Sequence, residues 1–206
     1  MSPLRLLSLL ALSFLAACGG SDSDTPSTPV CSDAGKAASA LSASNTVCML
    51  TTQGEIVVEL NPASSTITVA NFLRYVNAKL YDNTLYHRVV KNFVIQGGGY
   101  GTSGTAVSTY APIALESNNG LSNVRGTIAM ARTSVPNSAT SQFFFNTVDN
   151  SACLNYGSTT CDANGYAVFG KVIAGIDVID KINAVSVDTS GLPVQPVVTY
   201  WAIQLK

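Results

Sequence analysis

The sequence predicts a mainly β domain: an eight-stranded antiparallel closed barrel capped by two α-helices. Short β-rich runs alternate with turns from about Asn45 to the end of the chain, which is the spacing of an all-β barrel. Only two stretches change to a helical period, and no internal repeat divides the chain. At 206 residues and 47% hydrophobic content, the chain is long enough to bury the core of one such domain.

The eight predicted strands are rich in β-branched and aromatic residues. The first two, "TVCMLTT" and "EIVVEL", flank a turn at Gln53-Gly54 and form a predicted hairpin. The other six are the runs "TLYHRVV", "NFVIQ", "GTIAMAR", "SQFFFNT", "GYAVFGKV" and "VVTYWAIQL". Their spacing favours antiparallel pairing, because antiparallel neighbours need only short connections.

The two predicted helices have apolar residues on one face. In "SSTITVANFLRYVNAK", four apolar side chains recur at i, i+3, i+4 and i+7, and Ser64 to Thr66 offers the N-cap. These four are Val69, Phe72, Leu73 and Val76. The second helix covers Ile176 to Ile182, where isoleucines are spaced by three. Each helix therefore presents an apolar stripe that can close the barrel.

The first eighteen residues, "MSPLRLLSLLALSFLAAC", predict an export signal. One positive charge at Arg5 precedes an apolar run from Leu6 to Ala17, which is too short to span a membrane. The last four of the eighteen resemble a bacterial lipobox, in which the cysteine, here Cys18, becomes the lipidated first residue of the mature chain. The alternative is an ordinary secretory signal that happens to contain Cys18.

These features divide the chain into three parts. We expect residues 1–18 to be a lipoprotein signal peptide and lipobox, 19–44 a flexible tether, and 45–206 the folded domain. The tether begins with "GGSDSDTPSTP", which has no apolar periodicity. The expected location is the bacterial cell envelope, with a lipid anchor on Cys18 at the outer membrane or the periplasmic face.

Four cysteines remain after Cys18, an even number in an oxidising compartment, where pairing is expected. Three connectivities are open. We favour Cys31 with Cys48, at the start of the fold, and Cys153 with Cys161, closing the local loop "CLNYGSTTC". Zinc is the competing interpretation, but the spacings match no common zinc pattern.

Composition and motifs exclude several functions. Charged residues are 11% of the chain, the net charge is -1 and no basic block occurs, so we expect no nucleic-acid partner. Gly99, Gly101 and Gly104 fit a dinucleotide fingerprint, but "TAVSTYAP" follows in place of the required helix. His87, the only histidine, has no G-x-S-x-G nucleophile to serve, and strand alternation places it opposite Arg88. A structural histidine is the favoured interpretation.

Two longer segments, "YHRVVKNFVIQGG" and "GTIAMARTSVPNSATSQFFFN", resemble a cyclophilin-type peptidyl-prolyl cis-trans isomerase, closest to the bacterial periplasmic branch. The resemblance covers roughly Val47 to Leu205 and includes "YAVFGKV", "GIDVIDKI" and the helix around "ANFLRYV". It implies an eight-stranded barrel closed by two helices, in agreement with the strand count above. It also implies an isomerase of X-Pro bonds with no metal or organic cofactor.

The resemblance assigns site residues position by position. The implied catalytic residues are Arg88, Phe93 and Gln96. The implied substrate-binding residues are Met130 as a pocket methionine, Ala131 and Arg132 as backbone that pairs with the peptide, and Gln142, Phe144 and Leu154. This chain departs from the family at Cys153, where many cyclophilins have an aromatic residue, and Tyr166 stands nearest to a family histidine.

The chemistry of proline isomerisation suits these residue types. Rotation about the X-Pro bond has a barrier of about 18–20 kcal/mol because it breaks amide resonance. The proline nitrogen regains a lone pair in the twisted amide, so a donor such as Arg88 stabilises the transition state selectively. Gln96 can accept from that guanidinium, and the apolar residues form a socket for the ring. Alternation places Phe93 and Gln96 on opposite faces, so their convergence requires a bulge or strong twist.

We therefore expect a monomeric enzyme whose partners are proline-containing polypeptides. A catalytically weak peptide-binding or holdase lipoprotein that uses the same groove is the alternative. A purely structural surface lipoprotein is a third possibility.

Overall fold

The predicted hairpin opens the barrel in the computed structural model, which describes residues 28–206. Strand β1 (Thr46–Thr51) pairs antiparallel with β2 (Gly54–Leu60). Thr51 pairs with Gly54, so the two-residue turn is Thr52-Gln53, one position earlier than predicted. Gly54 has a φ of 131°, a conformation that favours glycine.

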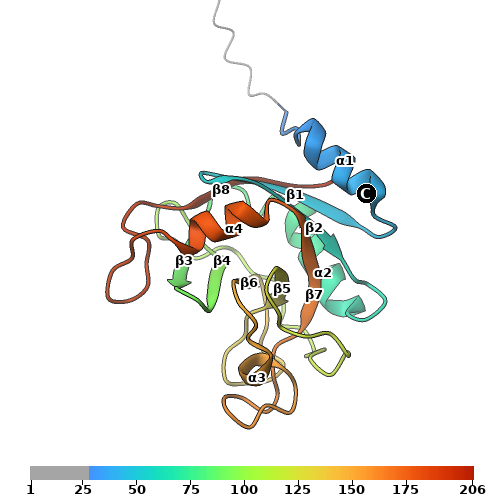
Figure 1. Cartoon of the computed structure of the whole chain (residues 1–206), viewed down its shortest axis with the longest axis vertical. Helices are drawn as coiled ribbons and strands as arrows, with labels where there is room; N and C mark the ends of the chain where they lie inside the picture. Colours follow the sequence, from blue (N-terminus) through green and yellow to red (C-terminus); the bar gives the residue numbers. More distant parts are fainter. Residues whose placement is uncertain (1–27) are drawn as a thin grey trace, which may run out of the picture.

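Six further strands complete the barrel. They are β3 (Thr84–Val90), β4 (Val94–Gly101), β5 (Thr127–Met130), β6 (Phe143–Asn146), β7 (Val168–Ala174) and β8 (Val198–Gln204). All pairings are antiparallel, in the closed order β1-β2-β7-β5-β6-β4-β3-β8 (Figure 1). This confirms the predicted fold class.

Helices α2 (Thr66–Asn77) and α4 (Ile176–Asn183) both contribute to the barrel core. The predicted stripe of α2 packs there, whereas the first of the three predicted isoleucines of α4, Ile176, is exposed. Phe72 of α2 is fully buried and its ring contacts those of Tyr81, Phe143 and Phe169 at centroid distances of 5.0–5.6 Å. From α4, the buried residues are Val178, Ile179 and Ile182. Burial of these apolar groups is the main term that holds both helices on the strands.

Two further helices lie outside the two-helix prediction. Helix α3 (Ser151–Leu154) is a single turn in the loops at the foot of the barrel, and α1 (Asp33–Leu41) packs outside the strands (Figure 1). Ser32 caps α1, since its Oγ accepts from the Gly35 N–H at 3.1 Å. A disulfide from Cys31, just before this N-cap, to Cys48 ties the start of α1 to β1.

The flexible tether predicted for residues 19–44 was therefore wrong for residues 33–41. Alanines give this stretch high helix propensity, and the disulfide anchors it where its weak apolar face alone would not. The part of that prediction that covers residues 19–27 lies outside the described residues, as do the predictions of the signal peptide, the lipobox and Cys18. Between residues 28 and 206, no helix has the length and apolar character of a membrane span.

Both favoured cysteine pairings are confirmed. Cys31 pairs with Cys48 at a Cα–Cα distance of 6.1 Å, and Cys153 pairs with Cys161 at 5.0 Å. Glu55 lies close to the first pair, and its carboxylate could complete a metal cluster with two thiolates. Since both sulfurs are joined to each other, they are not free to ligate a metal.

Candidate active site

A β-bulge in β3 determines the direction of Arg88. Tyr86 pairs with Gly97 and Arg88 pairs with Gln96, so two steps along β3 match one step along β4. Tyr86 and Val89 both belong to the barrel core although they are three residues apart. The two residues between them, His87 and Arg88, lie outside that core. The expectation that alternation separates His87 from Arg88 was therefore wrong, because the bulge interrupts it.

The turn between β3 and β4 positions Phe93 beside Gln96. Phe93 precedes the first residue of β4, and its N–H donates to the Val90 carbonyl at 3.0 Å. Asn92, just before it, has a φ of 56°. Because Phe93 is outside the regular strand, strand alternation does not apply to it. Val94 and Gln96 are two residues apart in β4 and share the outward face.

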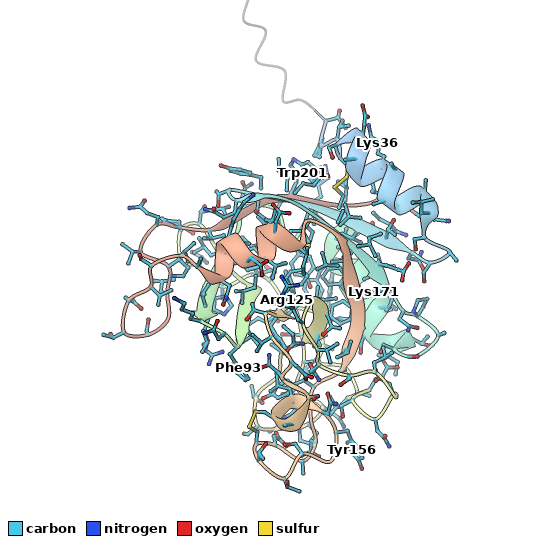
Figure 2. All side chains as sticks on the ribbon, in the orientation of Figure 1. Lys36, Phe93, Arg125, Tyr156, Lys171 and Trp201 are labelled. Carbon is cyan, nitrogen blue, oxygen red and sulfur yellow. A yellow bond between two sulfur atoms is a disulfide. The ribbon has the colours of Figure 1, made fainter. Side chains whose placement is uncertain are left out.

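These residues line a cavity of about 230 Å³ on the outer face of the barrel. Its floor is an apolar cluster in which Phe144 is 4% and Leu154 5% exposed, with Phe93 packed at its edge. The lining residues are Arg88, Phe93, Val94, Gln96, Ala131, Arg132, Phe144, Cys153, Leu154, Cys161 and Tyr166. Figure 2 shows Phe93 between the barrel strands and the loops around α3, with Tyr156 at the outer end of those loops. The cavity therefore combines an apolar floor with an arginine and a glutamine at its rim.

A second cavity of about 160 Å³ continues the first along the same surface. The two share Gln96, Ala131 and Arg132, and the second adds Thr133, Ser138, Thr140 and Gln142. The Gln96 side chain donates from Nε2 to Oε1 of Gln142 at 2.8 Å, which connects the two parts. Together the cavities form an elongated groove with an apolar end and a polar end, a shape suited to an extended peptide.

Met130 is the one predicted site residue that does not reach the groove. Its side chain is 1% exposed and belongs to the barrel core, whereas Ala131 lines both cavities. The assignment of Met130 to the pocket was wrong, because consecutive residues of an extended chain point to opposite faces. Val94 takes the pocket position instead. The two-residue spacing from Gln96 was the signal that could have identified it.

Arg132 anchors the loop that borders the cavity. Its side chain is fully buried and forms a 2.7 Å ion pair with Asp162. Nε and Nη2 also donate to the Gly165 carbonyl at 3.0 and 2.7 Å, and the guanidinium lies 4.6 Å from the Tyr166 ring centroid. Hydrogen bonds from Asn164 and from Arg132 lower the pKa of Asp162. The Arg132 guanidinium is thus committed to this loop, and only the main chain of this segment remains for a ligand.

The Arg88 side chain, by contrast, has no acidic partner among residues 28–206. None of the ion pairs formed within residues 28–206 involves Arg88. Its donors lie at the rim of a cavity whose floor is apolar. Such a cation is not neutralised by a carboxylate, so it can interact strongly with a ligand group that gains electron density.

His87 lies behind this rim and takes no position in either cavity. Its ring meets that of Tyr100 edge-on at a centroid distance of 4.9 Å, and its Nδ1 is buried without a hydrogen-bond partner among residues 28–206. Burial lowers the pKa of His87, an effect that the Leu85 backbone and the Gln142 side chain partly oppose. These features agree with the structural role favoured from the sequence.

The lowered pKa of His87 predicts a pH-dependent stability. In the unfolded chain His87 binds a proton near pH 6.5, whereas in the folded chain it does so only at lower pH. The contribution of neutral His87 to the free energy of unfolding is therefore complete above pH 6.5 and is lost as pH falls. Chemical denaturation of wild type and His87→Gln from pH 8 to pH 5 measures this. The free energy of unfolding should decline less steeply below pH 6.5 in the variant, while above pH 7.5 the two slopes should agree. Parallel curves throughout would refute the prediction.

Comparisons with known proteins agree with this geometry. The family model described as "Cyclophilin type peptidyl-prolyl cis-trans isomerase/CLD" matches residues 46–201. The chain is 51% identical over 158 residues to peptidyl-prolyl cis-trans isomerase cyp18 of Streptomyces antibioticus, covering 75% of this chain and 95% of that protein. It is 46% identical over 142 residues to peptidyl-prolyl cis-trans isomerase B of Escherichia coli, covering 69% and 86%.

A solved structure shares the fold. It is a cyclophilin type peptidyl-prolyl cis-trans isomerase of Cryptosporidium parvum, crystallised in the presence of the dipeptide Ala-Pro. The TM-score is 0.64 at 24% identity, over 77% of this chain and 97% of that one. The match of the family model and the identity to the bacterial relatives, together with the barrel and its groove, lead to one conclusion: the chain belongs to the cyclophilin-type family and is a peptidyl-prolyl cis-trans isomerase.

Proposed function

We propose that this isomerase acts on X-Pro bonds of exported polypeptides during their folding, by a non-covalent mechanism in which Arg88 stabilises the twisted amide. One observation carries the proposal. The bulge in β3 directs an arginine that has no acidic partner in the described part of the chain to the rim of a cavity with an apolar floor, large enough for a proline ring.

Each wall of the cavity has a part in the proposed mechanism. The proline ring rests on Phe93, Phe144 and Leu154, which exclude water from the bond that rotates. The peptide main chain runs along Ala131 and Arg132 toward the polar end of the groove. Gln96, held by Gln142, contacts the peptide carbonyl. The Arg88 guanidinium then donates to the proline nitrogen only while the amide is twisted, which lowers the barrier without tightening ground-state binding.

The proposed partners are proline-containing polypeptides. The structure of the Cryptosporidium parvum relative was obtained in the presence of the dipeptide Ala-Pro, a peptide of this chemistry. Two experiments test the proposal: a protease-coupled rate assay on a blocked Ala-Ala-Pro-Phe peptide, and refolding of a denatured exported protein with a proline-limited slow phase. We expect the enzyme to accelerate isomerisation of the peptide and the slow refolding phase. The control for the refolding experiment is a protein that refolds without a proline-limited slow phase.

The alternative function, a peptide-binding or holdase module, uses the same groove and differs in turnover. It predicts that titration with the peptide shifts NMR signals of the groove residues while neither rate changes. A structural surface lipoprotein predicts no shift at all. The half-buried Arg88 at the cavity favours catalysis, because simple apolar binding of proline needs no cation at the rim.

We further propose that the protein is a monomer attached to the bacterial cell envelope through a lipid on Cys18, at the outer membrane or the periplasmic face. The apolar run and the small residues before Cys18 support the anchor, and two disulfides in the folded domain support an oxidising compartment. Intact mass spectrometry of the mature protein tests this: it should begin at Cys18 and carry acyl chains. A mature chain that begins elsewhere, or that lacks lipid, contradicts the anchor.

A further inference from the structure

The Cys153–Cys161 disulfide forms part of the wall of the substrate cavity. Cys153 lies in α3 next to Leu154, which is 5% exposed in the apolar floor. Cys161 returns from the following loop, and both half-cystines line the 230 Å³ cavity together with Arg88 and Phe93. A change in this disulfide therefore changes the shape of the site where the ring of proline is proposed to bind.

Little else holds the loop between the two cysteines. Most of residues 156–161 are exposed, and the Tyr156 side chain points outward at 55% exposure (Figure 2). The contacts of the loop are surface hydrogen bonds, such as those from the Ser158 and Thr160 hydroxyls to the Ala152 carbonyl at 2.8 and 2.7 Å. Exposed hydrogen bonds contribute little net stability, so the covalent link is the main constraint on this segment.

The other end of the loop is fastened independently. Arg132 binds Asp162 and the Gly165 carbonyl, and Asn123 donates to the carbonyls of Leu154 and Tyr166. Opening the disulfide would free the segment before Asp162. It would leave Arg88 and Gln96 in place, since they belong to β3 and β4.

The two disulfides also differ in access. Cys31 and Cys48 are 1% and 0% exposed, whereas Cys161 is an exposed residue and Cys153 is partly exposed. A dithiol in solution can reach the Cys161 sulfur without unfolding the barrel, but it cannot reach the buried pair in this way. The part of the chain that the structure describes thus contains one protected disulfide and one that is accessible at the active site.

We propose that the Cys153–Cys161 disulfide sets peptide affinity, so that the oxidised enzyme binds proline peptides more tightly than the reduced enzyme. This inference rests on the proposed function. In reduction, a dithiol thiolate attacks the Cys161 sulfur, and Cys153 leaves as a thiolate that takes a proton. The second thiol of the reductant then releases Cys161, so two electrons pass to the protein and the reductant becomes a disulfide. Because the two equilibria are linked, bound peptide must make reduction less favourable by the same free energy by which the disulfide strengthens peptide binding.

The test compares the oxidised full-length protein with the same protein after mild dithiothreitol treatment. Alkylation and peptide mapping should find Cys153 and Cys161 reduced and Cys31 and Cys48 still paired. The Kd of the blocked Ala-Ala-Pro-Phe peptide, measured by NMR titration, should rise about tenfold on reduction. In the rate assay, KM should rise and kcat should change less than about twofold. Saturating peptide should make the disulfide harder to reduce by about 30 mV, the two-electron equivalent of tenfold.

The double variant Cys153→Ser/Cys161→Ser should reproduce the reduced enzyme and be indifferent to dithiothreitol. Cys31→Ser/Cys48→Ser is the matched control, which loses a disulfide far from the cavity and should keep the wild-type Kd in its folded state. Equal Kd values for oxidised and reduced enzyme, with mapping that confirms reduction, would overturn the inference alone. Prior reduction of the Cys31–Cys48 pair would also overturn it. Failure of the oxidised enzyme to bind the peptide would instead overturn the proposed function, and this inference with it.

Discussion

Arg88→Ala should lower kcat/KM for a proline peptide by about 10²–10³-fold, the range seen when a single transition-state donor is removed. The peptide Kd should change less than about threefold, because Arg88 is proposed to bind the proline nitrogen only in the twisted amide. The loss therefore falls on kcat. The protease-coupled assay measures the rate, and NMR titration measures the affinity.

Two further variants make this test specific. Arg88→Lys keeps the charge but loses the planar, multidentate donor, so it should recover only a small part of the activity. Arg125→Ala is the matched control, because Arg125 is an exposed arginine paired with Asp180 and lies outside both cavities. It should retain wild-type rates. If Arg88→Ala weakens binding and turnover by the same factor, the groove is a binding module and the proposed mechanism fails.

Gly98→Ala should lower the free energy of unfolding by about 2–5 kcal/mol. Gly98 has a φ of 75°, a conformation that costs an L-residue about 1–2 kcal/mol. An added Cβ would also lie 2.8 Å from the Tyr81 ring and 2.9 Å from the Phe143 ring, both fully buried, and such overpacking typically costs about 1–3 kcal/mol. Urea denaturation followed by circular dichroism measures the change.

Gly104→Ala separates the two contributions. Gly104 has a similar φ of 79°, but an added Cβ meets nothing within 4 Å. Only the conformational cost of about 1–2 kcal/mol should remain. If both variants lose the same amount, contact with the aromatic core contributes nothing at Gly98, and the packing argument is wrong.

The sequence alone determined most of the barrel. All eight strands and both capping helices follow from local patterns: alternation, helical period and turn residues within a few positions of one another. The favoured cysteine pairings likewise follow from short separations along the chain. Helix α1 was missed because its position depends on packing beside β2 and on the bond to Cys48, which no local pattern reveals.

The site divides in the same way. The family resemblance selected Arg88, Phe93, Gln96 and Phe144, which the structure brings to one cavity. Only the tertiary structure decided how they meet there. The register between β3 and β4 produces the bulge that turns Arg88 outward, and it leaves Phe93 in a turn. Alternation relative to Ala131 and Gln96 separates Met130 from the groove and places Val94 on it, but the pairing of the strands decides which of the two faces points to the core. Register is a long-range property that residue identity does not specify by itself.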